Sequence, residues 1–294
     1  MERDYVHGKL IGIAALPTFP DIMGEMARII EDPESSASDL ARHMDPAMVG
    51  EVLKAANNAC AGTDGFKGMA SLEQAIAVIG FERLLQIVLH MPFLSMTVGE
   101  NALFDENRFI SHSIVCGALS KEISSGLGLG NPGEVYLSGV MHDVGIIIIY
   151  RYFRKEWDAI LGLASASGIP RVEAERSLLS CDHGHVGADL LDMWKTPKSI
   201  TDGVRFHHEP EAATENRENV LVTYLANMLA KEVDLKEDLA NFDDFVARHR
   251  ASIDRATDFG PKLSATEEIT FLARIYGILK EAKGCVDGIT GEKR

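Results

Sequence analysis

The sequence predicts an all-helical protein. Two capping boxes, in which a serine is followed three residues later by Gln or Glu, lie at residues 71–74 and 264–267, and this pattern is typical of helix N-termini. After the second box, Ile269, Leu272 and Ile275 recur at helical spacing, as expected for one apolar helix face. Alternation of apolar and polar residues, which marks a half-buried strand, is scarce. We therefore expect helices to form the regular structure.

The expected helices follow one another along the chain. An amphipathic run at 22–30 stops before Pro33, because the residue ahead of a proline disfavours the helical conformation. Short helices are expected at 36–44 and 46–56, and a further helix begins after the capping box at 71–74. The polar stretch 211–219 is a candidate loop. It separates a core region from a C-terminal helical region.

Residues 144–150 are the exception to this simple pattern. The run is rich in β-branched side chains, and its propensity alone favours a buried strand. It lies between helical patterns, however, and no second segment offers a strand to pair with it. We therefore expect a buried helix here.

Composition and charge limit the classes of function. The 294 residues are 46% hydrophobic and 25% charged, which is typical of a globular protein long enough for one large or two modest domains. The formal net charge of -15 argues against a nucleic-acid or anionic-membrane partner, since phosphate binding needs clustered cations. The N-terminus has no apolar leader, and no apolar run approaches the roughly 20 residues of a membrane helix. We expect a cytoplasmic protein.

The cysteines do not indicate a disulfide framework. They are widely scattered and form no CxxC pair or zinc-finger spacing. Such a pattern is typical of reduced thiols in a cytoplasmic protein. The four residues are Cys60, Cys116, Cys181 and Cys285.

The histidines are the strongest candidates for chemistry. Six of the ten fall where they could share a site, namely His112, His142, His183, His185, His207 and His208. The adjacent His142 and Asp143 can both reach one cation if the backbone turns between the bracketing Gly139 and Gly145. Imidazole and carboxylate ligands suit Zn, Fe, Mn or Ni. A hydrogen-bonded polar cluster without metal remains the alternative.

The His207–His208 pair is expected at the end of a helix that begins near Pro197 and stops before Pro210. Neighbouring side chains on a helix point about 100° apart. The two imidazoles are therefore expected to serve two different ions, or one ion and one substrate, rather than one ion in the same way.

The order of these residues resembles the HD superfamily of metal-dependent phosphohydrolases. Residues 10–210 resemble more specifically the HDOD domain, the HD-related output domain of bacterial signalling proteins. The matching phrases are LPTFP at 16–20, LKAANN at 53–58, AIAVIG at 75–80, GVMHDVG at 139–145, DHGHVG at 182–187, WKTP at 194–197 and HHEP at 207–210.

The resemblance implies an HD-domain-like helical bundle and a set of ligands. The HDOD domain would span 10–210, with an N-terminal helical part at about 10–100 and an HD-like core at about 104–210. A C-terminal helical extension at 211–284 would pack on the core, and 285–294 would be a flexible tail. One or two divalent transition-metal ions would be held by His112, His142, Asp143, His183, His207, His208 and Asn227, with Asp143 as the bridge and, in a hydrolase, the catalytic residue.

Two departures from the superfamily pattern bear on catalysis. The HD-GYP phosphodiesterases have a lysine shortly after the His-Asp pair and a downstream GYP motif, whereas this chain has Ile146 and no such motif. The late Asp of the superfamily is matched by Asn227, which can ligate through its carbonyl oxygen but brings no charge. Asp143 would then be the only carboxylate, which favours a small anionic or phosphate ligand in the pocket.

The resemblance implies a bacterial signal-transduction or regulatory module that acts through a protein partner, which the sequence does not identify. The alternative is a metal-dependent phosphohydrolase acting on a phosphodiester, a nucleotide or a phosphomonoester. A homodimer is compatible with the sequence, which does not locate its surface.

Overall fold

The computed structural model describes residues 6, 8, 10, 44, 46–60, 71–72, 74–80, 84, 104–232, 241–258 and 264–290. Every regular element in these ranges is a helix, and no strand occurs in them, so the predicted all-α fold is confirmed. None of the described helices combines the length and apolar character needed to cross a membrane. The chain forms two compact units, one of residues 1–14 with 105–294 and the other of residues 15–104.

The smaller unit contains helix α4, Pro46–Ala59, which confirms the helix expected at 46–56. Its buried side chains include Val52 and Ala56, one turn apart on one face. The backbone N–H of Gln74 points at the Ser71 hydroxyl at 3.5 Å, as expected for the first capping box. The run expected at 22–30 and nearly all of 36–44 lie outside the described residues.

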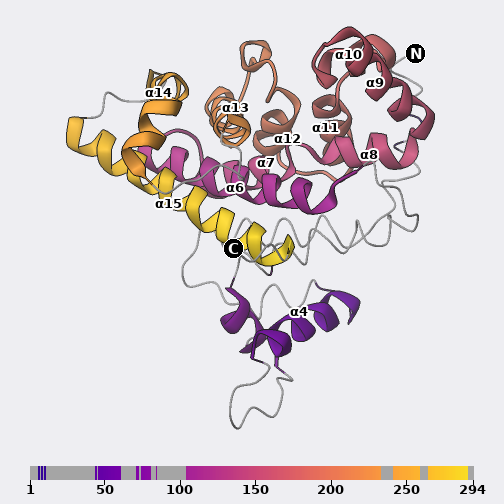
Figure 1. Cartoon of the computed structure of the whole chain (residues 1–294). Coiled ribbons are helices and arrows are strands. Elements are labelled where there is room, and N and C mark those ends of the chain that lie inside the picture. Colours follow the sequence, from indigo (N-terminus) through magenta and orange to yellow (C-terminus); the bar gives the residue numbers. More distant parts are fainter. Residues whose placement is uncertain are drawn as a thin grey trace. The chain divides into compact units, whose positions relative to one another are not determined.

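The larger unit carries the helices from α6 onwards (Figure 1). They are α6 (Glu106–Leu127), α7 (Pro132–Met141), α8 (Val144–Tyr152), α9 (Arg154–Ser167), α10 (Arg171–Leu179), α11 (His183–Met193), α12 (Lys198–Arg205), the 3-10 helix η1 (Pro210–Ala212), α13 (Arg217–Glu232), α14 (Phe242–Asp258) and α15 (Ala265–Thr290).

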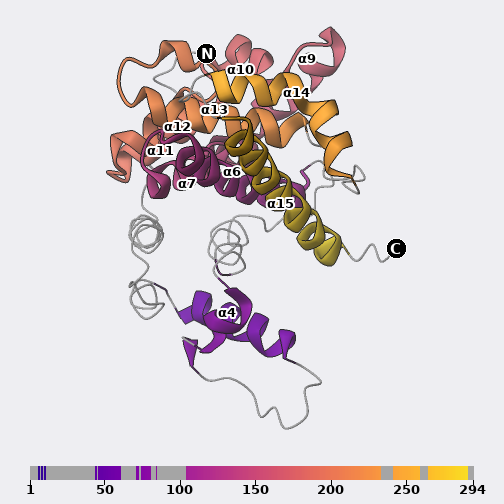
Figure 2. The ribbon, with the colours of Figure 1, turned by 90° about the vertical axis from the view of Figure 1, so that its left-hand side faces the viewer.

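The long helix α6 organises this unit. It packs against α7, α13 and α15, and both views of the ribbon show these helices around it (Figures 1 and 2). Leu119 and Ile123 of α6 share one apolar cluster with Leu225 of α13, Phe245 of α14 and Ile275 of α15. The C-terminal helices therefore bury the same core as α6, and this core holds α6 against them.

Residues 144–150 form part of helix α8, as predicted. The residues from Val144 to Ile149 are all buried, so the helix meets protein on every side. Intrinsic propensity is a weak preference that tertiary burial overrides. Burial therefore decides the structure of this β-branched run.

The capping box at 264–267 forms in full at the start of α15. The backbone N–H of Ser264 donates to the Glu267 carboxylate at 2.8 Å, and the backbone N–H of Glu267 points back at the Ser264 hydroxyl at 3.4 Å. Helix α15 continues to Thr290, into the segment 285–294 for which the sequence predicts a tail.

Two glycines allow backbones to approach around the His142–Asp143 turn. A Cβ on Gly139 of α7 would lie 2.6 Å from the backbone oxygen of Cys116 on α6. A Cβ on Gly145 of α8 would overlap the backbone oxygen of His183 at the start of α11. The absence of side chains here lets α6 and α11 come against the turn from either side.

Overpacking typically lowers the free energy of unfolding by about 1–3 kcal/mol. We expect the decrease in Gly145→Ala to lie near the upper end of this range, because the new methyl meets rigid backbone. Urea unfolding followed by circular dichroism measures this change. Gly162→Ala in α9 is the matched control: nothing lies within 4 Å of its added Cβ, so it should stabilise the helix by roughly 0.5–1 kcal/mol. Equal stability of the two variants would contradict the prediction.

Candidate metal centre

The candidate ligands come from separate helices and turns of the larger unit. His112 lies on α6, His142 and Asp143 form the turn between α7 and α8, and His183 opens α11. The remaining three are His207 and His208 in the turn after α12, and Asn227 on α13. The folded chain gathers six of these seven residues into two adjacent groups of potential ligands. The first group is Asp143, His183, His207 and His208. The second is His112 and His142, together with Cys116, which was not among the candidates.

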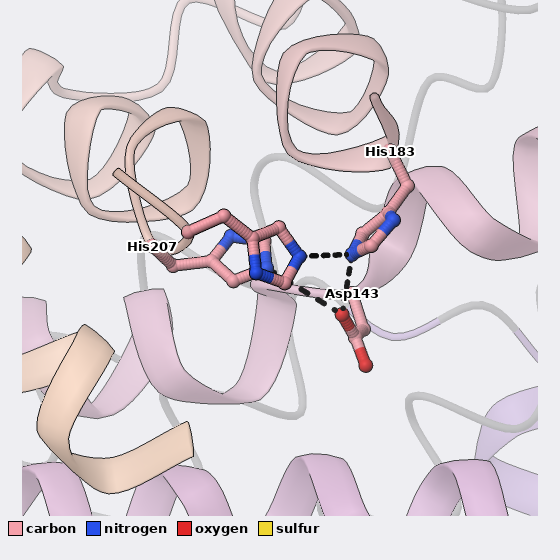
Figure 3. Close-up of side chains that lie close together, drawn as sticks. Asp143, His183 and His207 are labelled. Carbon is pink, nitrogen blue, oxygen red and sulfur yellow. Dashed lines mark hydrogen bonds and ion pairs between the residues drawn. The ribbon is translucent and has the colours of Figure 1, made fainter. Parts of the chain in front are cut away.

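The Asp143 carboxylate faces both groups. Its Oδ1 lies 3.0 Å from Nε2 of His183 and 3.7 Å from Nε2 of His207 (Figure 3). Its Oδ2 lies 3.3 Å from Nε2 of His142 and 3.8 Å from Nε2 of His112. Asp143 occupies the N-cap position of α8, where an aspartate usually accepts a backbone N–H, yet it makes no such bond. The carboxylate is therefore turned towards the histidines instead of capping its helix.

Backbone carbonyls orient two of the imidazoles. Nδ1 of His142 lies 2.7 Å from the Gly139 oxygen, and Nδ1 of His207 lies 2.6 Å from the Val204 oxygen. A carbonyl only accepts hydrogen bonds, so Nδ1 carries the proton in both rings and, when the ring is neutral, Nε2 presents a lone pair. This is how metal-binding histidines are usually held.

His183 is held by a carboxylate instead. Glu175 of α10 is fully buried and accepts both the backbone N–H of His183, at 2.9 Å, and its Nδ1–H, at 2.6 Å. On the other side of the ring, Nε2 lies 2.9 Å from Nε2 of His208. The imidazole therefore stands between Glu175 and the cluster, in the arrangement of a carboxylate–histidine–metal triad.

Three buried polar atoms at the site form no well-aligned hydrogen bond within the described part of the chain: Nε2 of His207, Oδ1 of Asn227, and Oδ1 of Asp143, whose approach to Nε2 of His183 is an ion pair. Buried polar atoms are nearly always paired, and exceptions mark places where an ion or water completes the structure. All three atoms are metal-ligand types. The residues present therefore fit a metal ion.

The His207–His208 pair differs from the expectation. Helix α12 ends at Arg205, so both residues lie in the turn that follows rather than on the helix. Their ring centroids are 4.0 Å apart, and both rings offer an atom to the group around Asp143. The 100° separation of helical neighbours does not apply in this turn, and the two imidazoles can meet the same ion.

His185 is placed apart from these groups. Its Nδ1 lies 2.8 Å from Oδ1 of Asp182, the residue that caps α11. It belongs to neither group of potential ligands. The prediction that His185 could share a site with the other five histidines is therefore not supported.

Asn227 lies beside His112. Its side chain is 3% exposed, and its interaction with the His112 imidazole acts to raise the pKa of that ring. The position matches the place of the late acidic ligand that the resemblance implies. Its role as a ligand stays a prediction.

Burial keeps most of the cluster uncharged. It lowers the pKa of His112 to about 3 and of His208 to about 2, and in each case a neighbouring histidine adds to the effect. Burial likewise holds the pKa of His207 well below its usual value. Near neutral pH these rings are neutral, which is the form that binds metal.

Asp143 and His183 are the charged members. Burial opposes ionisation of Asp143, but His142 and His183 together hold the pKa of the carboxyl well below its usual value. Burial also opposes a charge on His183, but Glu175 and Asp143 outweigh it and raise the pKa of the ring to about 9. The metal-free site therefore contains a carboxylate–imidazolium pair.

We expect the metal-free protein to lose stability on acidification from pH 6.5 to 4. Over this range the unfolded chain takes up protons on His112, His207 and His208, whose pKa values in the folded protein are lowered, so unfolding binds protons and becomes easier. The pKa of His183 in the folded protein is raised to about 9, so this ring is protonated in both the folded and the unfolded chain over most of this range. The stability that it contributes is lost only as the pH rises from about 6.5 to 9. Urea unfolding at pH 6.5, 5.5 and 4.5 measures the slope. A His112→Asn variant should show a shallower slope, and a flat native profile would contradict the prediction.

A family model described as the HDOD domain matches residues 16–210. The chain belongs to the HDOD family. This agrees with the fold and with the ordered histidines, and it places all the candidate ligands except Asn227 inside the matched HDOD region.

Three proteins similar to this HDOD chain are distant from it in sequence. An uncharacterized protein of Treponema pallidum (strain Nichols) is 22% identical over 225 residues, which are 74% of this chain and 43% of that protein. The chain thus spans less than half the length of that relative. A crystal structure of an HDOD domain protein of unknown function from Geobacter sulfurreducens is 20% identical, with a TM-score of 0.63 over 97% of this chain and 98% of the other. A candidate signal transduction protein from Marinobacter aquaeolei VT8 is 17% identical, with the same TM-score over 97% of this chain and 65% of the other.

Sequence reasoning missed two residues of the HDOD site. Cys116 follows His112 by four residues on helix α6, and that spacing places both side chains on one face. Glu175 gave no comparable signal, because it lies on a different helix from His183 and only the fold brings the two together.

Proposed function

We propose that this HDOD protein is a regulatory module of bacterial signal transduction that acts in the cytoplasm through a protein partner. We also propose that its histidine-rich pocket holds one or two divalent transition-metal ions. The observation that carries the metal part is the Asp143 carboxylate, which is withheld from capping α8 and faces two groups of imidazoles. Zn, Fe, Mn and Ni suit such a donor set.

The charge of the pocket favours binding over turnover. Asp143 is the only carboxylate among the two groups of potential ligands in the described residues. Glu175 contacts the far side of His183, at Nδ1, and so orients that ring. Two divalent ions at this site would keep a net positive charge, and we infer that a small anion such as phosphate completes the pocket.

The regulatory role is supported by the family and by the residues that hydrolytic relatives need. The HDOD model matches most of the chain. Ile146 stands where the HD-GYP phosphodiesterases have a lysine, and it is buried in the apolar helix α8. No positively charged side chain is therefore offered from this position to a substrate phosphate.

Elemental analysis tests the metal part. Protein purified without added metal should retain one or two transition-metal ions per chain after dialysis. A metal-free protein that also fails to take up Zn, Fe, Mn or Ni would leave the hydrogen-bonded cluster as the correct account. Turnover of a phosphodiester by metal-loaded protein, abolished by Asp143→Ala, would overturn the non-enzymatic role.

A metal-dependent phosphohydrolase is the second candidate. It is favoured by the split of the Asp143 oxygens between two groups of imidazoles, since a carboxylate that bridges paired cations is a recurring arrangement in phosphoryl-transfer sites. Paired cations there would activate water and stabilise the leaving oxygen. Assays with a phosphodiester, a nucleotide and a phosphomonoester, each with Mn, Fe, Ni and Zn, decide between the two candidates.

A further inference from the structure

A buried thiol stands next to one half of the candidate centre. Cys116 lies one turn after His112 on α6 and is fully buried. Its Sγ is 3.5 Å from Nε2 of His112. Together with Nε2 of His142, these atoms form a group whose members all lie within 4.8 Å of one another.

The spacing of these donors matches one tetrahedral ion. Zinc–nitrogen bonds of about 2.0–2.1 Å and zinc–sulfur bonds of about 2.3 Å give tetrahedral edges of roughly 3.3–3.4 Å between two nitrogens and roughly 3.5–3.6 Å between nitrogen and sulfur. The observed separations are 3.3 Å between Nε2 of His112 and Nε2 of His142, and 3.5 Å between Nε2 of His112 and Sγ of Cys116. Oδ2 of Asp143 lies 3.3 and 3.8 Å from the same two nitrogens. The three donors of this group, with Oδ2 of Asp143 beside its two nitrogens, therefore have spacings close to those around one tetrahedral cation.

A second observation points to a ligand at the same place. The Asn227 side chain lies beside His112, and its buried Oδ1 forms no well-aligned hydrogen bond with the described residues. An amide oxygen carries no charge, so Asn227 does not neutralise a cation held by His112 and His142. Within the described ligand groups, the only negative charge near that cation would be the Asp143 carboxylate, which also faces the other group of potential ligands. Among the described residues of the two groups of potential ligands, the Cys116 thiol is the further group that can supply a negative charge on binding.

We propose that Cys116 binds, as a thiolate, the ion held by His112 and His142. The step forms a metal–sulfur bond and releases the thiol proton to solvent. This inference rests on the metal centre proposed above. It makes the two sides of Asp143 chemically different: one side offers imidazoles and Oδ1, and the other offers imidazoles, Oδ2 and sulfur. Thiolate favours Zn, Fe or Co over Mn, so the sulfur side selects the softer ions.

Cobalt substitution tests the proposal on the full chain. Metal-free protein is titrated with Co²⁺ while the absorption spectrum is recorded. The native chain should develop visible d–d bands together with a thiolate-to-cobalt charge-transfer band in the near ultraviolet. Cys116→Ser should lose the charge-transfer band and keep d–d bands from the remaining ligands. Cys181→Ser, at another buried cysteine that belongs to neither group of potential ligands, should keep both.

The outcomes separate this inference from the proposed centre. If cobalt binds with d–d bands and no charge-transfer band, the thiolate assignment is wrong and the metal centre stands. If no cobalt binds, both are wrong. X-ray absorption of the zinc-loaded native chain gives an answer that needs no variant: a sulfur scatterer at about 2.3 Å supports the assignment, and a shell of nitrogen and oxygen alone overturns it.

Discussion

Asp143→Asn is expected to abolish metal uptake on the Oδ1 side of the centre and to weaken it on the side of His112, His142 and Cys116. Both carboxylate oxygens face imidazoles, with Oδ1 directed to His183 and His207 and Oδ2 to His142 and His112. Asparagine keeps the volume but removes the only carboxylate charge in the two groups of potential ligands. Because the remaining ligands on the Oδ1 side are neutral when they bind, the Coulomb attraction for a cation is lost with it. The metal content measured by elemental analysis after dialysis should fall below that of the native chain, with at most the ion on the Cys116 side retained.

Asp158→Asn is the matched control for this experiment. Asp158 is an exposed residue of α9 that pairs with Arg154 on the same helix, and exposed pairs of this kind contribute about 1 kcal/mol or less to stability. Its metal content should equal that of the native chain. A normal metal content in Asp143→Asn would show that the ions, if bound, are held elsewhere.

Glu175→Ala is expected to weaken both the fold and the centre. Glu175 is fully buried, its Oε2 accepts two N–H groups of His183, and its Oε1 lies 3.1 Å from Nε of Arg171. Removing one partner of a buried ion pair leaves the other charge uncompensated, at a cost of about 3–5 kcal/mol. The His183 ring also loses the contact that orients it, and loss of such contacts typically lowers metal affinity about 10–100-fold.

Glu175→Gln separates the two effects. The amide keeps the size of the side chain and one accepting oxygen, but not the charge, so its loss of stability should be smaller than that of Glu175→Ala. Urea unfolding of the metal-free proteins gives the stability, and calorimetric titration with Zn²⁺ gives the affinity. Native stability and native affinity in Glu175→Ala would be incompatible with the role assigned to this residue.

The sequence predicted the helical fold and six of the site residues for identifiable reasons. The capping boxes are local signals, and helix α8 was inferred because no strand could pair with it. His112, His142 and Asp143 followed from an ordered motif. The direction of the His207 and His208 rings could not be predicted, because it depends on where α12 ends. The contact of Glu175 with His183 depends on the packing of α10 beside the start of α11, which no spacing in the sequence encodes.

The candidate ligands lie far apart along the chain, from His112 on α6 to His208 after α12. An ion held by them acts as a cross-link between helices that would separate on unfolding. Each tenfold rise of free metal above its dissociation constant then adds about 1.4 kcal/mol to the free energy of unfolding, provided that the unfolded chain does not bind the ion. The melting temperature of the protein should therefore rise with the concentration of the ion that the proposed centre binds, so that the supply of this ion sets the fraction of the chain that stays folded.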